Sequence, residues 1–401
     1  MRKEKTLVII GDGMADEPLE ELGGRTPLEA AATPAMDSLA REGFTGLVRN
    51  VPTGMEPGSD VAIMSILGYD PSVFYTGRGP LEALSMGIRP ADDETVFRCN
   101  FVSLIDDLLV DYSAGHITTA ESAELIAALQ DKLGSDRARF HHGVSFRNLL
   151  VCKGDFSRTK TYAPHDHMDE PWNRYLPSGP GSEFLVNLIE ESMAPLCSHT
   201  LNRKRVDAGK KPANSIWPWS GGRLPSIDPY AGKFGLEGVV VSAVDLVQGL
   251  GAAAGLAAAK VPGATGMVDT NYEGKVAAAI DSMEKHNFTL IHVEGMDEAG
   301  HIGDPELKME GVRRFDSLVV APLVEYIRKY DDFLLLLLPD HPTPIRIRTH
   351  NCDPVPFVAL RPGVRSPASA PAFTEAAARA TGISVLRGHT LLESLLNGDL
   401  Y

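Results

Sequence analysis

Three aspartates in this chain each follow a strongly apolar stretch. They are Asp12 after Leu7–Ile10, Asp297 after Leu290–Val293, and Asp340 after Leu334–Leu338. If these stretches are parallel strands of one sheet, their carboxyl ends lie on a common edge, where ligands bind. Carboxylates gathered there raise one another's pKa, and a cation is needed to keep them all ionised. The placement therefore predicts a cation-binding site at the strand ends.

Histidines accompany two of these aspartates. His301 follows Asp297 by four residues, a spacing that brings two side chains onto one face of a helix. His341 directly follows Asp340, and His350 comes nine residues later. Carboxylate and imidazole ligands without a thiolate suit Mn²⁺, Zn²⁺, Co²⁺ or Mg²⁺ at a reactive site rather than a structural zinc. The set is larger than one catalytic ion takes, which predicts a pair of ions.

Each of these residues also has a purely structural interpretation. Asp12, between two glycines, is a common turn residue. Asp297 and His301 could be an exposed pair on a helix, and His341 could be a loop residue bonded to backbone. Their joint placement after apolar stretches favours the metal-site interpretation.

Ser59 begins a helix-compatible segment directly after Pro57 and Gly58. The structural interpretation is that Ser59 is a helix N-cap. The functional one is that a serine at a helix N-terminus faces free N–H groups and a positive dipole end, which stabilise a phosphoryl group. Beside a metal ion its hydroxyl could lose a proton and attack phosphorus.

The apolar stretches are continuous rather than alternating, which is typical of strands buried on both faces of a parallel sheet. Val239–Val241 is a further run of this kind, and helical patterns such as Lys275–Lys285 and Val312–Arg328 lie between the runs. We expect an α/β core with a mostly parallel sheet covered by helices on both faces.

The middle of the chain has strand and helix patterns of its own, such as Ser145–Val151. We expect residues 89–230 to form a smaller, inserted α/β domain. Residues 1–88 and 231–401 would then form a discontinuous, metal-binding core.

Composition excludes several classes of function. The formal net charge of the 401 residues is −15, and no basic run is present, which argues against nucleic acid and anionic membranes. The four cysteines are far apart, as expected in a reducing cytosol. The run after Met1–Lys5 is too short for a signal peptide, and Gly249–Ala259 is too short to span a bilayer and predicts a close-packed helix. We expect a soluble, cytoplasmic protein.

Several motifs together resemble a known family. They are GDGMAD, PGSDVA, LGYDP with TGRGPLEA, SAGHITT, SAVDLVQGLG, PGATGMVDTNYEGK, DEAGH, and DHPTP followed by TH and DPVP. In this order, over nearly the whole chain, they resemble the archaeal-type 2,3-bisphosphoglycerate-independent phosphoglycerate mutases of the alkaline phosphatase superfamily. The resemblance implies an alkaline-phosphatase-like core with an inserted substrate-binding domain.

The resemblance also implies roles for individual residues. Asp12, Ser59, Asp340 and His341 match the ligands of one divalent ion, and Asp297, His301 and His350 match those of a second. Ser59 matches the nucleophile. The implied reaction converts 3-phosphoglycerate, a small phosphorylated acid, to 2-phosphoglycerate through a phosphoserine. Mn²⁺ is the first expectation for the ions, with Mg²⁺, Co²⁺ and Zn²⁺ as alternatives.

Substrate contacts are harder to match. The segment NRKRVDAGKKPANSIWPWSGG lacks a clear counterpart of the substrate-domain arginines of longer bacterial mutases. We nominate Arg78, His116, Arg147 and Lys233 as substrate contacts, with surface charge or helix termini as their structural interpretation. Trp217 and Trp219 are expected to pack the second domain.

The branch within the superfamily stays open at this point. DHPTP and RTHNCDPVP also resemble a subgroup proposed to act as homoserine kinases. A phosphotransferase of that kind, or a phosphohydrolase on the same site, is therefore the alternative to the mutase. The sequence does not determine the oligomeric state.

Overall fold

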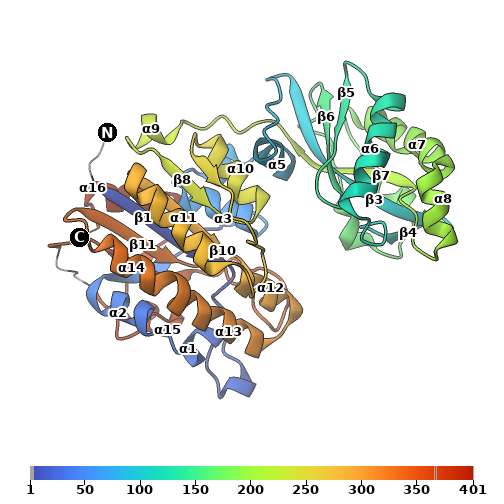
Figure 1. Ribbon diagram of the computed structural model, residues 1–401. Helices are drawn as coiled ribbons and strands as arrows, with labels where there is room; N and C mark the ends of the chain where they lie inside the picture. The colour runs from blue at the N-terminus through green and yellow to red at the C-terminus, as the bar shows by residue number, and fades with distance from the viewer. Residues whose placement is uncertain (1–3, 365, 367, 401) are drawn as a thin grey trace. The chain divides into compact units, whose positions relative to one another are not determined.

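The computed structural model describes residues 4–364, 366 and 368–400, and the chain divides into two compact units (Figure 1). The first consists of Met1–Tyr75 and Ser226–Tyr401, and the second is Thr76–Pro225. The second unit therefore begins before residue 89, where the sequence placed its border. The reason is α5 (Arg78–Ser85), which packs on strands of the second unit. Gly79 lies so close to them that a Cβ there would be 2.3 Å from the carbonyl oxygen of Val96.

The first unit is built on an eight-stranded sheet in the order β13-β2-β12-β11-β1-β10-β8-β9. Its strands are β1 (Lys5–Gly11), β2 (Phe44–Val48), β8 (Gly238–Val241), β9 (Ala257–Ala259), β10 (Phe288–Val293), β11 (Phe333–Leu338), β12 (Val355–Leu360) and β13 (Ser384–Val385). The strands from β11 to β9 are parallel, whereas β12 runs antiparallel to both β11 and β2. The predicted α/β core with a mostly parallel sheet is confirmed.

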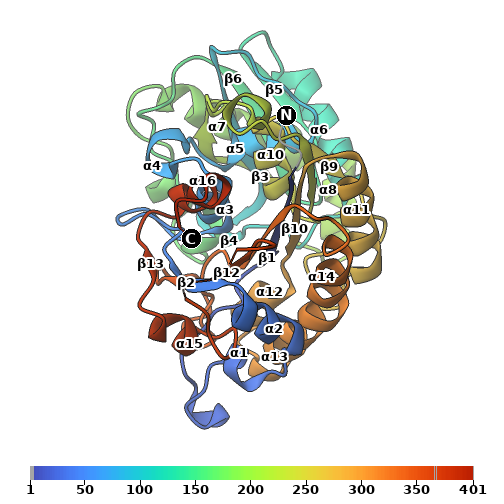
Figure 2. The same ribbon diagram turned by 90° about the vertical axis from the view of Figure 1, so that its left-hand side faces the viewer.

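Helices cover both faces of this sheet (Figure 2). The helices of the unit are α1 (Pro27–Ala30), α2 (Pro34–Glu42), α3 (Ser59–Ile66), α4 (Pro71–Phe74), α9 (Tyr230–Lys233), α10 (Asp245–Ala253), α11 (Tyr272–Lys285), α12 (Gly295–Ile302), α13 (Pro305–Phe315), α14 (Ala321–Ile327), α15 (Glu375–Ala380) and α16 (Leu391–Asn397). In Figure 2, α11 and α14 lie on one side of β1 and β10, and α3 and α16 lie on the other. All residues of β10 and β11 are buried, which explains why their sequences do not alternate.

The structure bears out one helical prediction and corrects another. The pattern Val312–Arg328 is helical to Ile327, with a π-helical turn at Asp316–Val320, and the Asp316 carboxylate accepts the N–H groups of Ala35 and Met36 at the start of α2. The tract Gly249–Ala259 is helical only to Ala253. It then turns at Gly255, with φ +76°, and Ala257–Ala259 pairs with β8 as an edge strand.

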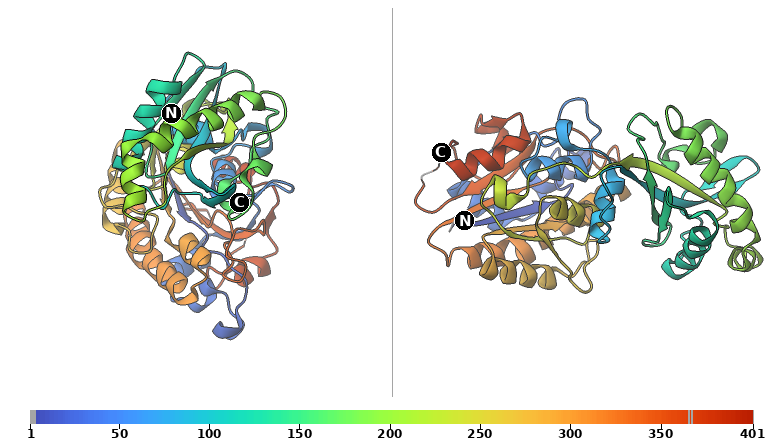
Figure 3. Two further views of the ribbon diagram at one scale, coloured as in Figure 1. Left: turned by 90° about the vertical axis from the view of Figure 1, so that its right-hand side faces the viewer. Right: turned by 90° about the horizontal axis from the view of Figure 1, so that it is seen from above.

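The second unit has a five-stranded antiparallel sheet (Figure 3). Its strands are β3 (Glu94–Ile105), β4 (Leu108–Asp111), β5 (Ala138–His141), β6 (Arg147–Lys153) and β7 (Ser215–Gly222), and its longer helices are α6 (Thr119–Leu133), α7 (Ser182–Ser198) and α8 (Thr200–Asp207). Neighbouring residues of β3 face opposite ways: Phe97 joins the core under α6 and α7, and Val96 joins the core under α5. Trp217 and Trp219 are buried in this unit, as expected.

Capping explains where several helices begin. α6 starts with a capping box in which Thr118 and Glu121 bond each other's backbone N–H groups. α13 starts at Asp304, whose carboxylate accepts the N–H of Leu307, and Pro305 follows at the first helical position. Among the described residues, no helix combines the length and the apolar character that a membrane span requires.

Glu375 makes the stability of the first unit depend on pH. Its buried carboxylate accepts bonds from the N–H of Asp16 and the hydroxyl of Thr26, and burial raises its pKa from 4.5 to about 7. The folded state thus holds a proton that the unfolded chain has already lost between these pH values. The contribution of Glu375 to the unfolding free energy is therefore fully present below the unfolded pKa of 4.5. This contribution, about 3 kcal/mol, is lost as pH rises through about 7.

We predict that Glu375→Gln removes this dependence, because the amide stays neutral throughout. Urea unfolding followed by circular dichroism between about pH 5 and pH 8 measures the difference. The exposed Glu20→Gln is the matched control, which should keep the wild-type slope. An unchanged slope in Glu375→Gln would contradict the prediction.

Candidate metal centre

The register of the parallel strands brings the three aspartates to one edge. Gly11 pairs with Val293, and Ile10 pairs with Leu338, so that β1, β10 and β11 end at the same level. The segments that follow carry Asp12 and Asp340 in loops and Asp297 in the first turn of α12, and all three side chains are almost fully buried. The three aspartates therefore converge in the structure, as the sequence predicted.

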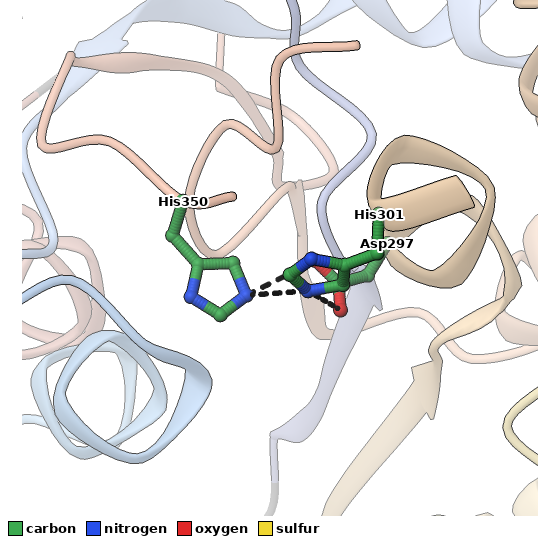
Figure 4. A group of neighbouring side chains, drawn as sticks. All are labelled: Asp297, His301 and His350. Carbon is green, nitrogen blue, oxygen red and sulfur yellow. Dashed lines mark hydrogen bonds and ion pairs between the residues drawn. The ribbon is translucent and has the colours of Figure 1, made fainter. Parts of the chain in front are cut away.

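Asp297, His301 and His350 form one group of potential ligands (Figure 4). Asp297 and His301 lie one turn apart on α12, with His301 Nε2 3.2 Å from Asp297 Oδ2. His350, from the loop after β11, places its Nε2 3.4 Å from Asp297 Oδ1 and 3.0 Å from His301 Nε2. A carboxylate and two imidazole nitrogens thus face one point.

The other ring nitrogens explain this orientation. His301 Nδ1 lies 3.0 Å from the carbonyl oxygen of Arg348, and His350 Nδ1 lies 3.3 Å from that of Pro57. A carbonyl can only accept, so each Nδ1 donates, and Nε2 is the ring atom left to bind a proton or a metal ion beside Asp297. Such backbone-anchored imidazoles are typical of metal ligands. Hydrogen bonding to Asp297 raises the pKa of His301 to about 9, so Asp297 stabilises positive charge at this point.

Asp12, Asp340, His341 and Ser59 form a neighbouring group. His341 Nε2 lies 3.4 Å from Asp340 Oδ2 and 3.7 Å from Asp12 Oδ1. Ser59 Oγ lies 3.2 Å from His341 Nε2 and 3.3 Å from Asp12 Oδ2. The hydroxyl therefore sits among the side chains that the sequence assigned to one ion.

Two buried carboxylate oxygens in this group accept no hydrogen bond from the described residues. They are Asp12 Oδ1 and Asp340 Oδ2, both next to His341 Nε2. Burial, together with the nearby charges of Asp340, Asp297 and Glu294, raises the pKa of Asp12 well above its ordinary value. An unpartnered buried carboxylate oxygen is costly unless a cation binds it, so the donor set fits divalent metal ions.

Ser59 is the first residue of α3 and not its N-cap. The cap is Gly58, whose φ of 176° is extended backbone and which has no side chain to bond the first N–H groups. The structural interpretation of Ser59 as an N-cap is therefore wrong. The side chain points instead to Asp12 and His341, while the positive end of the helix dipole lies beside it.

Polar residues that the sequence analysis did not identify hold the ligand loops. Asn50 donates to the carbonyl oxygens of Pro339 and Asp340, at 3.3 and 2.8 Å. Thr343 donates to Asp297 Oδ1 at 2.5 Å. Lys308 of α13 is fully buried and donates to Asp16 Oδ2 and to the carbonyl oxygens of Ala15 and Thr343, which ties the first loop to the third.

His292 is another residue that the sequence analysis did not identify. It lies inside β10, is fully buried, and places Nε2 2.8 Å from Asp12 Oδ2. A histidine in an otherwise apolar strand was a signal present in the sequence. Its partner could not be deduced, because Asp12 is 280 residues away along the chain.

The nominated substrate contacts do not all lie together. Lys233 is in the first unit, where its ammonium group donates to the carbonyl oxygen of Gly68 at 2.7 Å and lies over the ring of Tyr69. The other three belong to the second unit. Arg78 begins α5, Arg147 begins β6 above the ring of Phe146, and His116 lies beside that same ring.

Arg98 is a further arginine of the second unit. It lies 4.6 Å from the ring of Trp219 and pairs with Glu82 at 2.9 Å. Burial lowers the pKa of Arg98, while the charge of Glu82 opposes this shift. Arg98 lies on β3 two residues from Asn100, which pairs with Arg147 of β6, and α5 packs on β3. Arg98 lies within the long strand β3, and nothing in its sequence context distinguished it.

Comparisons with known proteins identify the class and then the family. A family model described as 2,3-bisphosphoglycerate-independent phosphoglycerate mutase matches residues 40–202. A solved structure of a cofactor-independent phosphoglycerate mutase from Thermoplasma acidophilum has a TM-score of 0.68 and 27% identity, over 98% of this chain and 99% of that one. A protein of known structure from Pyrococcus horikoshii has a TM-score of 0.83 and 29% identity, over 99% and 98%. Fold and site thus define a protein of the phosphoglycerate mutase class.

Curated relatives narrow this assignment. A probable 2,3-bisphosphoglycerate-independent phosphoglycerate mutase of Geobacter sulfurreducens is 46% identical over 98% of this chain and 100% of its own length. The enzyme of that name from Methanosarcina acetivorans is 46% identical over 98% and 99%. The chain belongs to the 2,3-bisphosphoglycerate-independent phosphoglycerate mutase family, which is a family of isomerases. These relatives support the mutase and not the kinase alternative.

Proposed function

We propose that this protein interconverts 3-phosphoglycerate and 2-phosphoglycerate, with Ser59 as the transient phosphoryl acceptor. The observation that carries the proposal is the position of Ser59 Oγ, 3.3 Å from Asp12 Oδ2 and 3.2 Å from His341 Nε2 at the start of α3. Family membership supports the substrate pair. The free state of the four cysteines agrees with a cytoplasmic enzyme of glycolysis and gluconeogenesis.

Two ions would be held by the two groups of side chains. Asp12, Ser59, Asp340 and His341 would hold one, and Asp297, His301 and His350 the other. When bound, the divalent ions neutralise phosphate oxygens and lower the pKa of a nearby hydroxyl. We expect Mn²⁺, because the mixed carboxylate and imidazole set without thiolate suits it.

The chain's own residues account for the phosphoryl transfer. Ser59 Oγ attacks phosphorus, and its new bond forms as the bond from phosphorus to the substrate oxygen breaks. Over this step Ser59 loses one proton and the departing substrate oxygen gains one, which leaves phosphoserine and free glycerate. The N–H groups at the start of α3 face the transferred phosphoryl oxygens. The glycerate then turns, and its other hydroxyl takes the phosphoryl group back, which restores Ser59.

The second unit would bind the anionic substrate. Arg78 and Arg147 belong to this unit, and guanidinium groups suit carboxylate and phosphate oxygens, whereas Arg98 is already paired with Glu82. Lys233 is less suitable, since its ammonium group already donates to Gly68. His116, beside Phe146, remains a proposed contact.

Ser59→Ala should abolish mutase activity, by at least about a thousandfold, because the alanine side chain has no oxygen to accept the phosphoryl group. Activity is measured with 3-phosphoglycerate and Mn²⁺, without bisphosphoglycerate, by coupling to enolase. Mass spectrometry of acid-quenched wild type should find phosphate on the Ser59 peptide. Ser38→Ala, on α2, is the matched control and should stay active. A fully active Ser59→Ala would reject the proposal.

Each of the two ligand groups should bind one metal ion independently of the other. Metal-free protein refilled with Mn²⁺ should hold two ions per chain, and His350→Ala should hold one, because only one group loses a ligand. Asp340→Asn should likewise lose one ion, and the double variant should lose both. Elemental analysis after gel filtration makes the measurement. Two ions retained in either single variant would contradict the assignment of ligands.

Arg147→Gln should raise the KM for 3-phosphoglycerate by about 10- to 100-fold while two ions remain bound, because a charge-assisted contact is lost. Arg137→Gln is a matched control, since Arg137 also lies over a phenylalanine ring, that of Phe184. Steady-state kinetics at saturating Mn²⁺ measure the two KM values. Equal KM values for the two variants would remove Arg147 from the substrate site.

A further inference from the structure

A chain of buried hydrogen bonds ends on Asp12. Ser242, directly after β8, places Oγ 3.1 Å from His292 Nδ1, and His292 Nε2 lies 2.8 Å from Asp12 Oδ2. His292 and Asp12 are both fully buried, and Ser242 is nearly so. The carbonyl oxygen of His292 also accepts a bond from the buried ammonium group of Lys275, at 3.3 Å. Three neighbouring strands thus contribute to the environment of one carboxylate.

The direction of this chain follows from its end at a carboxylate. Asp12 Oδ2 accepts from His292 Nε2, so that nitrogen carries the ring proton and the neutral ring accepts at Nδ1. The Ser242 hydroxyl then donates to Nδ1, and its oxygen also accepts the backbone N–H of Val244 at 3.0 Å.

The consequence for Asp12 is that its two oxygens differ. Oδ2 accepts from His292 and lies within reach of Ser59, whereas Oδ1 accepts no hydrogen bond from the described residues. We propose that His292 is a positioning residue that occupies Oδ2 of Asp12 and so presents Oδ1 as the metal-binding atom, with Ser242 setting the imidazole tautomer. This inference rests on the metal centre of the proposed function.

Direct metal binding by His292 is the competing interpretation. His292, Asp12 and Asp340 lie close enough to share an ion. Both ring nitrogens of His292 are already used, however, one by Ser242 and one by Asp12. A hydrogen-bonded partner behind a ligand carboxylate, rather than a ligand, is therefore what the geometry supports.

Two substitutions at one position separate these roles. The amide nitrogen of a glutamine reaches about as far as Nε2 of histidine, and that of an asparagine only as far as Nδ1. His292→Gln can thus still donate to Asp12, whereas His292→Asn cannot. We expect His292→Asn to weaken Mn²⁺ binding to one of the two ions by about 10- to 100-fold and His292→Gln to bind nearly as the wild type does.

The affinity is measured by titrating Mn²⁺ into metal-free, full-length protein, with free Mn²⁺ read by electron paramagnetic resonance. His142→Gln, at an exposed histidine of the second unit, is the matched control and should bind both ions as the wild type does. Equal weakening by His292→Gln and His292→Asn would overturn the proposal. If His292→Gln altered the visible spectrum of the Co²⁺-loaded protein, His292 would be a ligand, which would also overturn it.

Ser242→Ala supplies a second test that does not require a change at His292. Loss of the Ser242 hydroxyl should weaken Mn²⁺ binding in the wild-type background, because the imidazole of His292 can then place its proton on Nδ1. In the His292→Gln background it should have no further effect, since an amide has no tautomer to select. Equal effects in both backgrounds would overturn the role of Ser242.

The controls distinguish this inference from the proposed function. Wild type that binds two ions, with His292→Asn unchanged in affinity, would overturn only the role of His292. Wild type that binds no Mn²⁺ would overturn the metal centre and the inference together. Unfolding midpoints in chelator should be compared first. If His292→Asn does not fold, the Ser242→Ala pair decides the question.

Discussion

Buried negative charge at one edge of the sheet is the constraint on which the site depends. Asp12, Asp297 and Asp340 are each at most 5% exposed, and burying carboxylates so close together is unfavourable unless positive charge faces them. Imidazoles, backbone N–H groups and the start of α3 supply part of it. Two divalent cations would exceed three carboxylates by one positive charge, and a site of that sign can admit a phosphoryl group.

The sheet makes this concentration of charge possible. Parallel strands end together, so loops from distant parts of the chain meet without long excursions. Each ligand loop is then tied to another element: Asn50 holds the backbone at Asp340, and Lys308 joins the loop after β1 to the loop after β11. Ligands held by such outer contacts keep their geometry when charge changes during a reaction.

The two units hold their charged groups differently. The first buries its charged groups behind apolar strands, whereas the second keeps guanidinium groups on an antiparallel sheet beside aromatic rings, as Arg98 does on Trp219. Arginine retains its charge when partly buried and binds oxygen atoms in pairs.

The sequence by itself determined the buried strands, the aspartates that follow them, the Asp297–His301 pair and the serine at the start of α3. These depend on local pattern: continuous apolar runs, a four-residue spacing and a strand-end rule. Only the tertiary structure decided that His292 bonds Asp12, that Lys233 bonds Gly68, that Arg98 pairs with Glu82, and that the second unit begins at Thr76. The reason is physical: a side chain's partner is set by which distant segments pack beside it, and local periodicity carries no record of that choice.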